Sequence, residues 1–217
     1  MTFQQSNESK RPPLIERGRR QVFREQGGAD FTVTAVDETV VATGESLTLH
    51  VASVKDGRPG AVCLVVLRSG EQDELLLARH WRVATGEWDW EFPRGMGEAD
   101  ENPETTALRE LCEETGIRAQ LEQVHILSSI HADAGVLRDD VRVAQVLFTK
   151  DEDIRQVLEV VPRAGKAEGT DWELSDLQWV KAQDFRALAV AGYIVDGLTL
   201  AAFAIYEWNK ADGVTCA

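Results

Sequence analysis

The residues with the clearest chemical potential are carboxylates concentrated in one short stretch of the chain. Between Asp89 and Gly116 there are two basic residues, Arg94 and Arg109, against nine acidic ones: Asp89, Glu91, Glu98, Asp100, Glu101, Glu104, Glu110, Glu113 and Glu114. Nine acids against two bases give a local charge of −7, which is half of the net charge of −14. Such a density of carboxylates indicates either a solvated acidic surface or a cation-binding site.

Part of this acidic stretch is predicted to be a helix. Asn102 can cap its N-terminus, Pro103 suits the first helical position, and Gly116 suits the position after its end. The glutamates that then fall within an arc of about 100° are Glu110, Glu113 and Glu114. Mg²⁺ or Mn²⁺ would neutralise this face, since both ions take carboxylate oxygens together with water and substrate phosphate. A solvated acidic face is the alternative.

The same stretch resembles a known motif. From Gly95 it reads GMGEADENPETTALRELCEETGI, which is a glycine, five residues, Glu101, seven residues and then RELCEETGI. This pattern resembles the Nudix box with every fixed position filled. The flanking segments LLLARHWR, WEFPRG and AGYIVDGLTLAAFAIYEW are similar to the ADP-ribose pyrophosphatase-like branch of that family. The resemblance covers roughly residues 60 to 208.

The resemblance implies a reaction and a set of site residues. The reaction is hydrolysis of a nucleoside diphosphate linked to another moiety, such as ADP-ribose, by metal-assisted attack of water on phosphorus. The implied ligands of Mg²⁺ or Mn²⁺ are the backbone carbonyl of Arg94 and the carboxylates of Glu110, Glu113 and Glu114. Glu101 and Arg109 would form a structural pair that fixes the loop against the helix.

The general base has two possible locations in this family. One is a glutamate of the box, here Glu113, and the other is an acid on a later loop, here GKAEGTDWE. In that loop Glu168 is the first candidate because glycines nearby would let the loop close over substrate, and Asp171 and Glu173 come after it. Each of these acids could instead be an ordinary exposed loop residue.

Two further positions match residues that contact substrate in the same branch. Arg82 ends the segment LLLARHWR, and Glu91 lies in WEFPRG. The alternative interpretations are a salt bridge at the end of a strand for Arg82 and a metal-shell or loop-anchoring carboxylate for Glu91.

The elements around the helix predict an α/β or α+β protein with a mixed sheet. Val- and Thr-rich segments between Phe31 and Val54 predict strands. The apolar run AVCLVVLR predicts a strand buried on both faces, paired with ELLLARHWR. Further strands are expected at 121–130 and 141–149 and in LQWV, and helices at 184–190 and 198–208. The family resemblance specifies a Nudix-type α/β/α sandwich over residues 55–210. It is preceded by a β-rich arm over residues 1–54, of which 1–28 read as a mobile arm or a short helix.

Composition restricts the partners and the compartment. A chain of 217 residues with 43% hydrophobic residues is typical of a globular protein, and the net charge of −14 argues against nucleic acid and anionic membranes as partners. Three cysteines without paired spacing favour a reducing cytoplasm. Residues 187–206 are long enough for a membrane span, but their glycines and Asp196 favour two short helices.

The resemblance also leaves some alternatives open. It implies a small-molecule nucleotide substrate and a homodimer formed by residues from about 30 to 54. One alternative is a Nudix-fold sensor of nucleotide sugars that does not turn over its ligand. Another is a Nudix hydrolase of dinucleoside polyphosphates or nucleoside triphosphates.

Overall fold

The chain divides into two compact units. The structure is a computed structural model that describes residues 11–164, 169 and 173–211. The first unit contains the chain up to Asp56 together with Asp133–Arg138, and the second contains Gly57–Ala132 and the chain from Asp139 onward.

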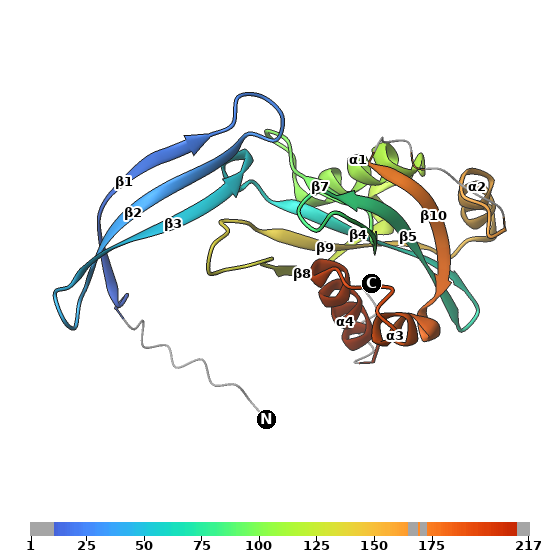
Figure 1. Ribbon diagram of the computed structural model, residues 1–217. Helices are drawn as coiled ribbons and strands as arrows, with labels where there is room; N and C mark the ends of the chain where they lie inside the picture. The colour runs from blue at the N-terminus through green and yellow to red at the C-terminus, as the bar shows by residue number, and fades with distance from the viewer. Residues whose placement is uncertain (1–10, 165–168, 170–172, 212–217) are drawn as a thin grey trace. The chain divides into compact units, whose positions relative to one another are not determined.

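The first unit is a three-stranded antiparallel sheet in the order β1-β2-β3 (Figure 1). Its strands are β1 (Leu14–Arg24), β2 (Phe31–Val40) and β3 (Ser46–Val54), followed by the short 3₁₀ turn η1 (Lys55–Gly57). The sequence predicted β2 and β3 correctly. A mobile arm or a short helix over residues 1–28 is wrong for Leu14–Arg24. Nearly all of β1 is exposed, so it lacks the apolar alternation that marks a strand, and its conformation comes from pairing with β2.

The second unit is built on a mixed sheet in the order β10-β5-β4-β9-β8. These strands are β4 (Gly60–Ser69), β5 (Gln72–Arg82), β8 (Val124–Ile130), β9 (Val141–Phe148) and β10 (Leu174–Lys181). Two short strands, β6 (Glu87–Glu91) and β7 (Arg94–Met96), pair with β5 and β4. The β4–β9 pair is parallel and the others are antiparallel, which confirms the predicted mixed sheet.

Helices cover both faces of this sheet, and β4 shows how the two cores are separated. Alternate β4 residues such as Cys63 and Val65 join the cluster that includes helices α1 (Pro103–Thr115) and α2 (Asp151–Val160). Their neighbours Val62 and Leu64 join the cluster of α3 (Ala182–Val190) and α4 (Gly197–Ala211), as Figure 1 illustrates. The apolar run of β4 is therefore buried on both faces, as predicted. A 3₁₀ turn, η2 (Leu121–Gln123), precedes β8.

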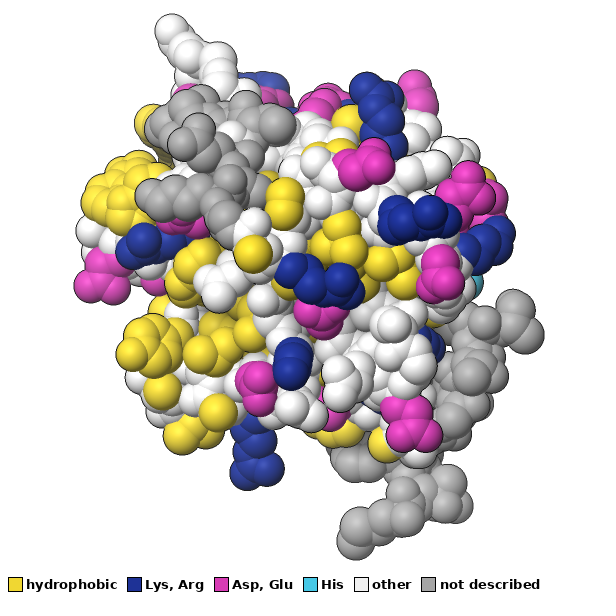
Figure 2. All heavy atoms as spheres, turned by 90° about the vertical axis from the view of Figure 1, so that its right-hand side faces the viewer, with side chains coloured by type: hydrophobic (Ala, Val, Ile, Leu, Met, Phe, Trp, Pro, Cys, Tyr) yellow, Lys and Arg dark blue, Asp and Glu magenta, His cyan; other side chains and the backbone are white. Residues whose placement is uncertain are grey.

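Residues 187–206 contain the end of α3 and the start of α4, as the sequence predicted. No helix among the described residues is long and apolar enough to span a membrane. On the face shown in Figure 2, hydrophobic side chains gather on one side, and acidic and basic side chains are interspersed over the rest.

The C-terminal end of α4 is fixed to the start of β5 by a buried carboxylate. Asp73 accepts hydrogen bonds from the Tyr206 hydroxyl, from Lys210 Nζ at 3.0 Å and from Arg68 Nε at 2.8 Å. Burial alone would raise the pKa of Asp73, but the hydrogen bonds from Arg68, Tyr206 and Lys210 outweigh it and lower the pKa to about 2. Asp73 is thus ionised at neutral pH and ties α4 to the sheet.

Candidate active site

Helix α1 carries the acidic face, and its two ends are fixed by the residues that the sequence indicated. Asn102 Oδ1 accepts a hydrogen bond from Thr105 N at 2.8 Å, and Pro103 occupies the first turn. Gly116 has φ 76°, the left-handed conformation that glycine adopts without strain, and its N–H donates to Cys112 O. The predicted helix and both of its caps are confirmed.

Glu101 and Arg109 hold the loop before α1 against the helix. Arg109 donates to Glu101 Oε1 at 2.8 Å and to the backbone oxygen of Met96 at 2.9 Å. Glu101 also accepts from Glu98 N at 2.9 Å and from Thr106 Oγ1 at 3.0 Å. Hydrogen bonding from Arg109 lowers the pKa of Glu101 to about 2. The structural pairing expected from the resemblance is confirmed.

Glu110 lies directly over Gly95. A Cβ atom at position 95 would lie 2.0 Å from Glu110 Cδ, so the carboxylate occupies space that any other residue would fill. Arg109 Nη1 donates to Glu110 at 2.8 Å and to Glu113 at 2.9 Å. The Glu113 side chain is 59% exposed, compared with 12% for Glu110. The two carboxylates therefore share one guanidinium, with Glu110 inside the site and Glu113 at its rim.

Glu114 is the buried carboxylate of the helical face. Its Oε2 accepts from the backbone N–H of Arg94 at 3.1 Å and lies 3.8 Å from His80 Nε2. Burial, followed by the neighbouring Glu110 carboxylate, raises the pKa of Glu114 to about 8, against a smaller opposing effect of the Arg94 hydrogen bond. The folded protein without a cation at this site therefore keeps Glu114 protonated at neutral pH.

The residues at the two predicted substrate positions, Arg82 and Glu91, contact each other. Arg82 Nε donates to Glu91 Oε1 at 2.7 Å, and Arg94 Nε donates to Glu91 Oε2 at 2.9 Å. Burial would raise the pKa of Glu91, but the two arginines outweigh it and the pKa lies below its ordinary value. Their contacts in this structure match the alternative interpretations, which were a strand-end salt bridge for Arg82 and a loop-anchoring carboxylate for Glu91.

The donor set matches the chemistry of a hard divalent cation. Glu110 and Glu114 bring carboxylate oxygens to strand β7 at Arg94 and Gly95, and their mutual repulsion would be relieved by a cation. Within the described part of the chain, no three histidine, cysteine or acidic side chains are gathered closely enough to hold a metal ion. The third glutamate of the face, Glu113, is exposed and bonded to Arg109.

Some of the candidate general bases lie outside the residues that the structure describes. Glu168 and Asp171 lie outside the described residues. Glu173 is described, and its backbone oxygen accepts from Trp81 N at 2.9 Å. Glu113 is the candidate that belongs to the helical face.

Two residues of this site were not singled out by the sequence, His80 and Asp196. His80 is buried on β5 beside Glu114, and a lone histidine in a strand gives no signal of such a contact. Asp196 Oδ1 lies 3.4 Å from Arg94 Nη2. The aspartate stands immediately before an apolar helical run, which is a helix-start signal, but that signal predicts the cap and not the contact with Arg94.

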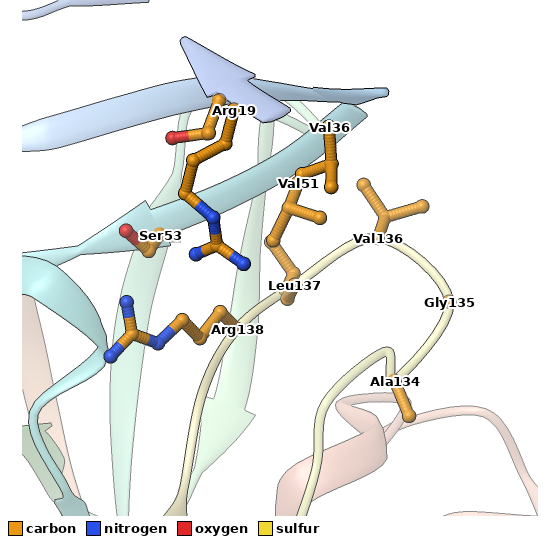
Figure 3. Close-up of a pocket in the computed structure, with 10 residues that line it drawn as sticks. Arg19, Val36, Val51, Ser53, Ala134, Gly135, Val136, Leu137 and Arg138 are labelled. Atoms are coloured by element: carbon orange, nitrogen blue, oxygen red, sulfur yellow. The ribbon is translucent and has the colours of Figure 1, made fainter. Parts of the chain in front are cut away.

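A separate cavity lies within the first unit. It has a volume of about 190 Å³ and is lined by β-sheet residues and by the 134–138 segment, with Arg19 and Arg138 both reaching into it (Figure 3). Arg19 is paired with Glu16 at 2.6 Å. None of the predicted catalytic, metal or substrate residues lines this cavity.

The fit of Glu110 over Gly95 leads to a prediction. Gly95→Ala should displace the Glu110 carboxylate, because the new Cβ would lie 2.0 Å from Glu110 Cδ. The obstructing atoms are the end of a flexible side chain, so the free energy of unfolding should change by less than about 1 kcal/mol. The resemblance implies that Glu110 is a metal ligand, and misplacing such a ligand should lower the hydrolysis that the resemblance also implies at least about tenfold. Urea unfolding and steady-state kinetics would test both, and unchanged kinetics would contradict the assignment of Glu110.

Comparisons with known proteins find a family, several relatives and a solved structure that this chain resembles. A model of the NUDIX domain family matches residues 57–197. The ADP-sugar pyrophosphatase of Mus musculus is 29% identical over 110 residues, which are 51% of this chain and 50% of the relative. A CMP-5'-(N-acetyl-N-hydroxy-3-aminopropyl)phosphonate hydrolase of Streptomyces rubellomurinus is 34% identical over 88 residues, covering 41% and 40%. A MutT-like protein of Streptomyces ambofaciens is 51% identical over 64 residues, covering 30% and 38%.

The alignments with these curated relatives cover half of their length or less. The match to a solved structure described as an ADP compounds hydrolase is longer. It covers 93% of this chain and 97% of the chain in that structure, with a TM-score of 0.63 and 18% sequence identity. At that identity the likeness establishes a shared fold.

Proposed function

The chain belongs to the NUDIX domain family, and from this premise we propose that it is a metal-dependent pyrophosphohydrolase of a nucleoside diphosphate linked to another moiety. The observation that carries the proposal is the complete acidic face of α1, with Glu114 buried against the Arg94 backbone and Glu110 fitted over Gly95. A decayed site, as expected of a sensor, would lack one or more of these carboxylates.

The proposed ligands of Mg²⁺ or Mn²⁺ are Glu110, Glu113, Glu114 and the backbone carbonyl of Arg94. A cation bound there would polarise the phosphoryl oxygens and lower the pKa of water. Positioning, substrate binding and proton transfer are assigned to side chains of the protein. Glu101 and Arg109 hold the loop in place, and Glu168 or Glu113 would accept a proton from the attacking water. Arg82 and Glu91, which bond each other in this structure, are the proposed substrate contacts.

The substrate class that we propose is a nucleoside diphosphate sugar such as ADP-ribose. Its support is the likeness to the murine ADP-sugar pyrophosphatase and the shared fold with the ADP compounds hydrolase. The relative from Streptomyces rubellomurinus is named for a CMP-linked phosphonate, so cytidine compounds belong in the same test.

A substrate panel tests this proposal. The full chain is incubated with Mg²⁺ or Mn²⁺ and ADP-ribose, other nucleoside diphosphate sugars, a CMP-linked phosphonate, dinucleoside polyphosphates and nucleoside triphosphates, and the products are identified by mass. Metal-dependent release of a nucleoside monophosphate from a diphosphate sugar is the expected result. Saturable binding without turnover would favour the sensor, and preference for polyphosphates or triphosphates would replace the proposed substrate.

We further propose that the protein acts in a reducing cytoplasm on small molecules, without nucleic acid or membrane partners, as a homodimer. The three-stranded sheet supports the dimer, because Ile15, Val22, Phe23 and Leu49 are between 44% and 52% exposed on it. Exposed apolar side chains gathered on one sheet are typical of an interface. Light scattering of the full chain should give twice the mass of 24.0 kDa, and a monomer at micromolar concentration would contradict this part of the proposal.

A further inference from the structure

The segment that delivers Glu91 and Arg94 to the acidic site is held by side chains at the start of α4. Between β6 and β7 the chain passes through Phe92 and Pro93, where sheet pairing is interrupted. Phe92 is completely buried, so its N–H requires an acceptor within the protein. That acceptor is Thr199 Oγ1, at 3.1 Å, from a residue that is itself fully buried.

Asp196 makes the second contact between α4 and this segment. Its Oδ2 accepts from Thr199 N at 2.8 Å and its backbone oxygen accepts from Leu200 N at 3.0 Å, so it caps the helix. Its other carboxylate oxygen, Oδ1, lies 3.4 Å from Arg94 Nη2. Both side chains are largely buried, at 25% exposed for Arg94 and 15% for Asp196.

The contacts of Thr199 and Asp196 hold the segment whose Arg94 and Glu91 are part of the proposed site. The Arg94 backbone N–H holds Glu114, its carbonyl is a proposed metal ligand, and its guanidinium holds Glu91. The α1 side of the segment is fixed by Glu114, and the α4 side by Thr199 and Asp196.

We infer that Thr199 and Asp196 are positioning residues, which place Glu91 and Arg94 for metal and substrate. The inference rests on the proposed function, because the positioned groups are its proposed ligands. Neither residue touches the reacting atoms. Losing Thr199 leaves the Phe92 N–H buried without its acceptor, and the segment then has to shift or open to satisfy it.

Four variants separate positioning from general stability. Thr199→Val keeps the shape of the side chain and removes the acceptor, whereas Thr199→Ser keeps the hydroxyl. Asp196→Asn keeps a capping oxygen and removes the charge that faces Arg94. Tyr206→Phe is the matched control, because it removes a hydrogen bond at the opposite end of the same helix.

Two measurements are made on the full chain without substrate: Mn²⁺ affinity by electron paramagnetic resonance, and amide hydrogen exchange over residues 91–94. Thr199→Val should speed exchange at Phe92 and weaken Mn²⁺ binding about tenfold, the lower end of what loss of a group that orients metal ligands costs. Asp196→Asn should weaken binding less, about threefold, because its contact with Arg94 is long for a hydrogen bond, at 3.4 Å. Thr199→Ser should stay within about twofold of the unaltered chain, and Tyr206→Phe should do so even though it unfolds at lower urea concentration.

The outcomes distinguish the inference from the proposed function. Unchanged exchange at residues 91–94 in Thr199→Val overturns the inference, whether or not metal binds. Faster exchange with unchanged Mn²⁺ affinity also overturns it, because the contact would then be structural only. Lack of saturable Mn²⁺ binding by the unaltered chain counts against the proposed metal site, and the exchange data still report on the contact itself.

Discussion

Glu114→Gln is expected to lower the proposed metal-dependent hydrolysis by about 10²- to 10³-fold, because it removes a buried carboxylate oxygen and its charge from the proposed cation site. The reason lies in the position of this carboxylate, which is buried and bonded to the backbone of Arg94 at 3.1 Å. Steady-state kinetics with a hydrolysed diphosphate sugar, at several Mg²⁺ concentrations, would measure the effect. Raised Mg²⁺ should restore little of the lost rate, because glutamine cannot supply the missing charge.

The same variant should not lose stability in the absence of metal. The pKa of Glu114 is about 8 in the folded protein, against an ordinary value of 4.5. The folded state therefore binds more protons between these values, and its stability falls as the pH rises across that window. Glutamine does not ionise, so the variant should not lose stability in this way. Urea unfolding from pH 5 to pH 8 should therefore show its free energy of unfolding rising relative to that of the unaltered chain.

Glu104→Gln is the control on the same helix, since Glu104 lies in the first turn of α1, away from the acidic face. It should retain the activity of the unaltered chain. Full activity of Glu114→Gln, or a loss of stability in that variant at pH 8, would contradict the role assigned to Glu114.

Local sequence chemistry was sufficient to predict the elements that carry the site. The caps of α1 are set by Asn102, Pro103 and Gly116 within a few residues of the helix they bound, so they can be read without tertiary information. The burial of β4 on both faces follows from its continuous apolar run. The charged strand β1 could not be predicted in this way, because its exposed side chains carry no pattern and only its partner strand fixes it.

The environment of the site residues depended on contacts distant in sequence. The helical pattern predicts that Glu110 and Glu114 share a face, but not that Gly95 leaves space for one carboxylate and the Arg94 N–H bonds the other. The contacts of Asp196 with Arg94 and of Thr199 with Phe92 join positions 102 and 107 residues apart. No local pattern links such positions. The sequence thus indicates which groups could do the chemistry, and the tertiary fold determines which of them are buried, shared or held in place.

Removal of the proposed general base should cause the second large loss of rate. Glu168→Gln should distinguish the role of the base from that of the proposed metal ligands. Loss of a general base lowers kcat by about 10²- to 10⁴-fold, while Mn²⁺ affinity should be unchanged, because the proposed metal ligands are on α1 and β7. Glu113→Gln should instead weaken Mn²⁺ binding together with the rate, because Glu113 belongs to the acidic face and is bonded to Arg109 beside Glu110. Kinetics and paramagnetic resonance titrations on the same preparations would distinguish the two.

Glu173→Gln and Asp171→Asn provide the comparison within the same loop. If Glu168 is the base, both should retain most of the rate, and the pH–rate profile of Glu168→Gln should lose its acidic limb, since that limb reports the ionisation of the base. A full rate in Glu168→Gln together with a loss in Glu173→Gln would move the role along the loop. A loss of rate confined to Glu113→Gln would move it to the helix. In that case one exposed carboxylate would both bind the cation and accept the proton, while the guanidinium of Arg109 bonds its Oε2 in this structure.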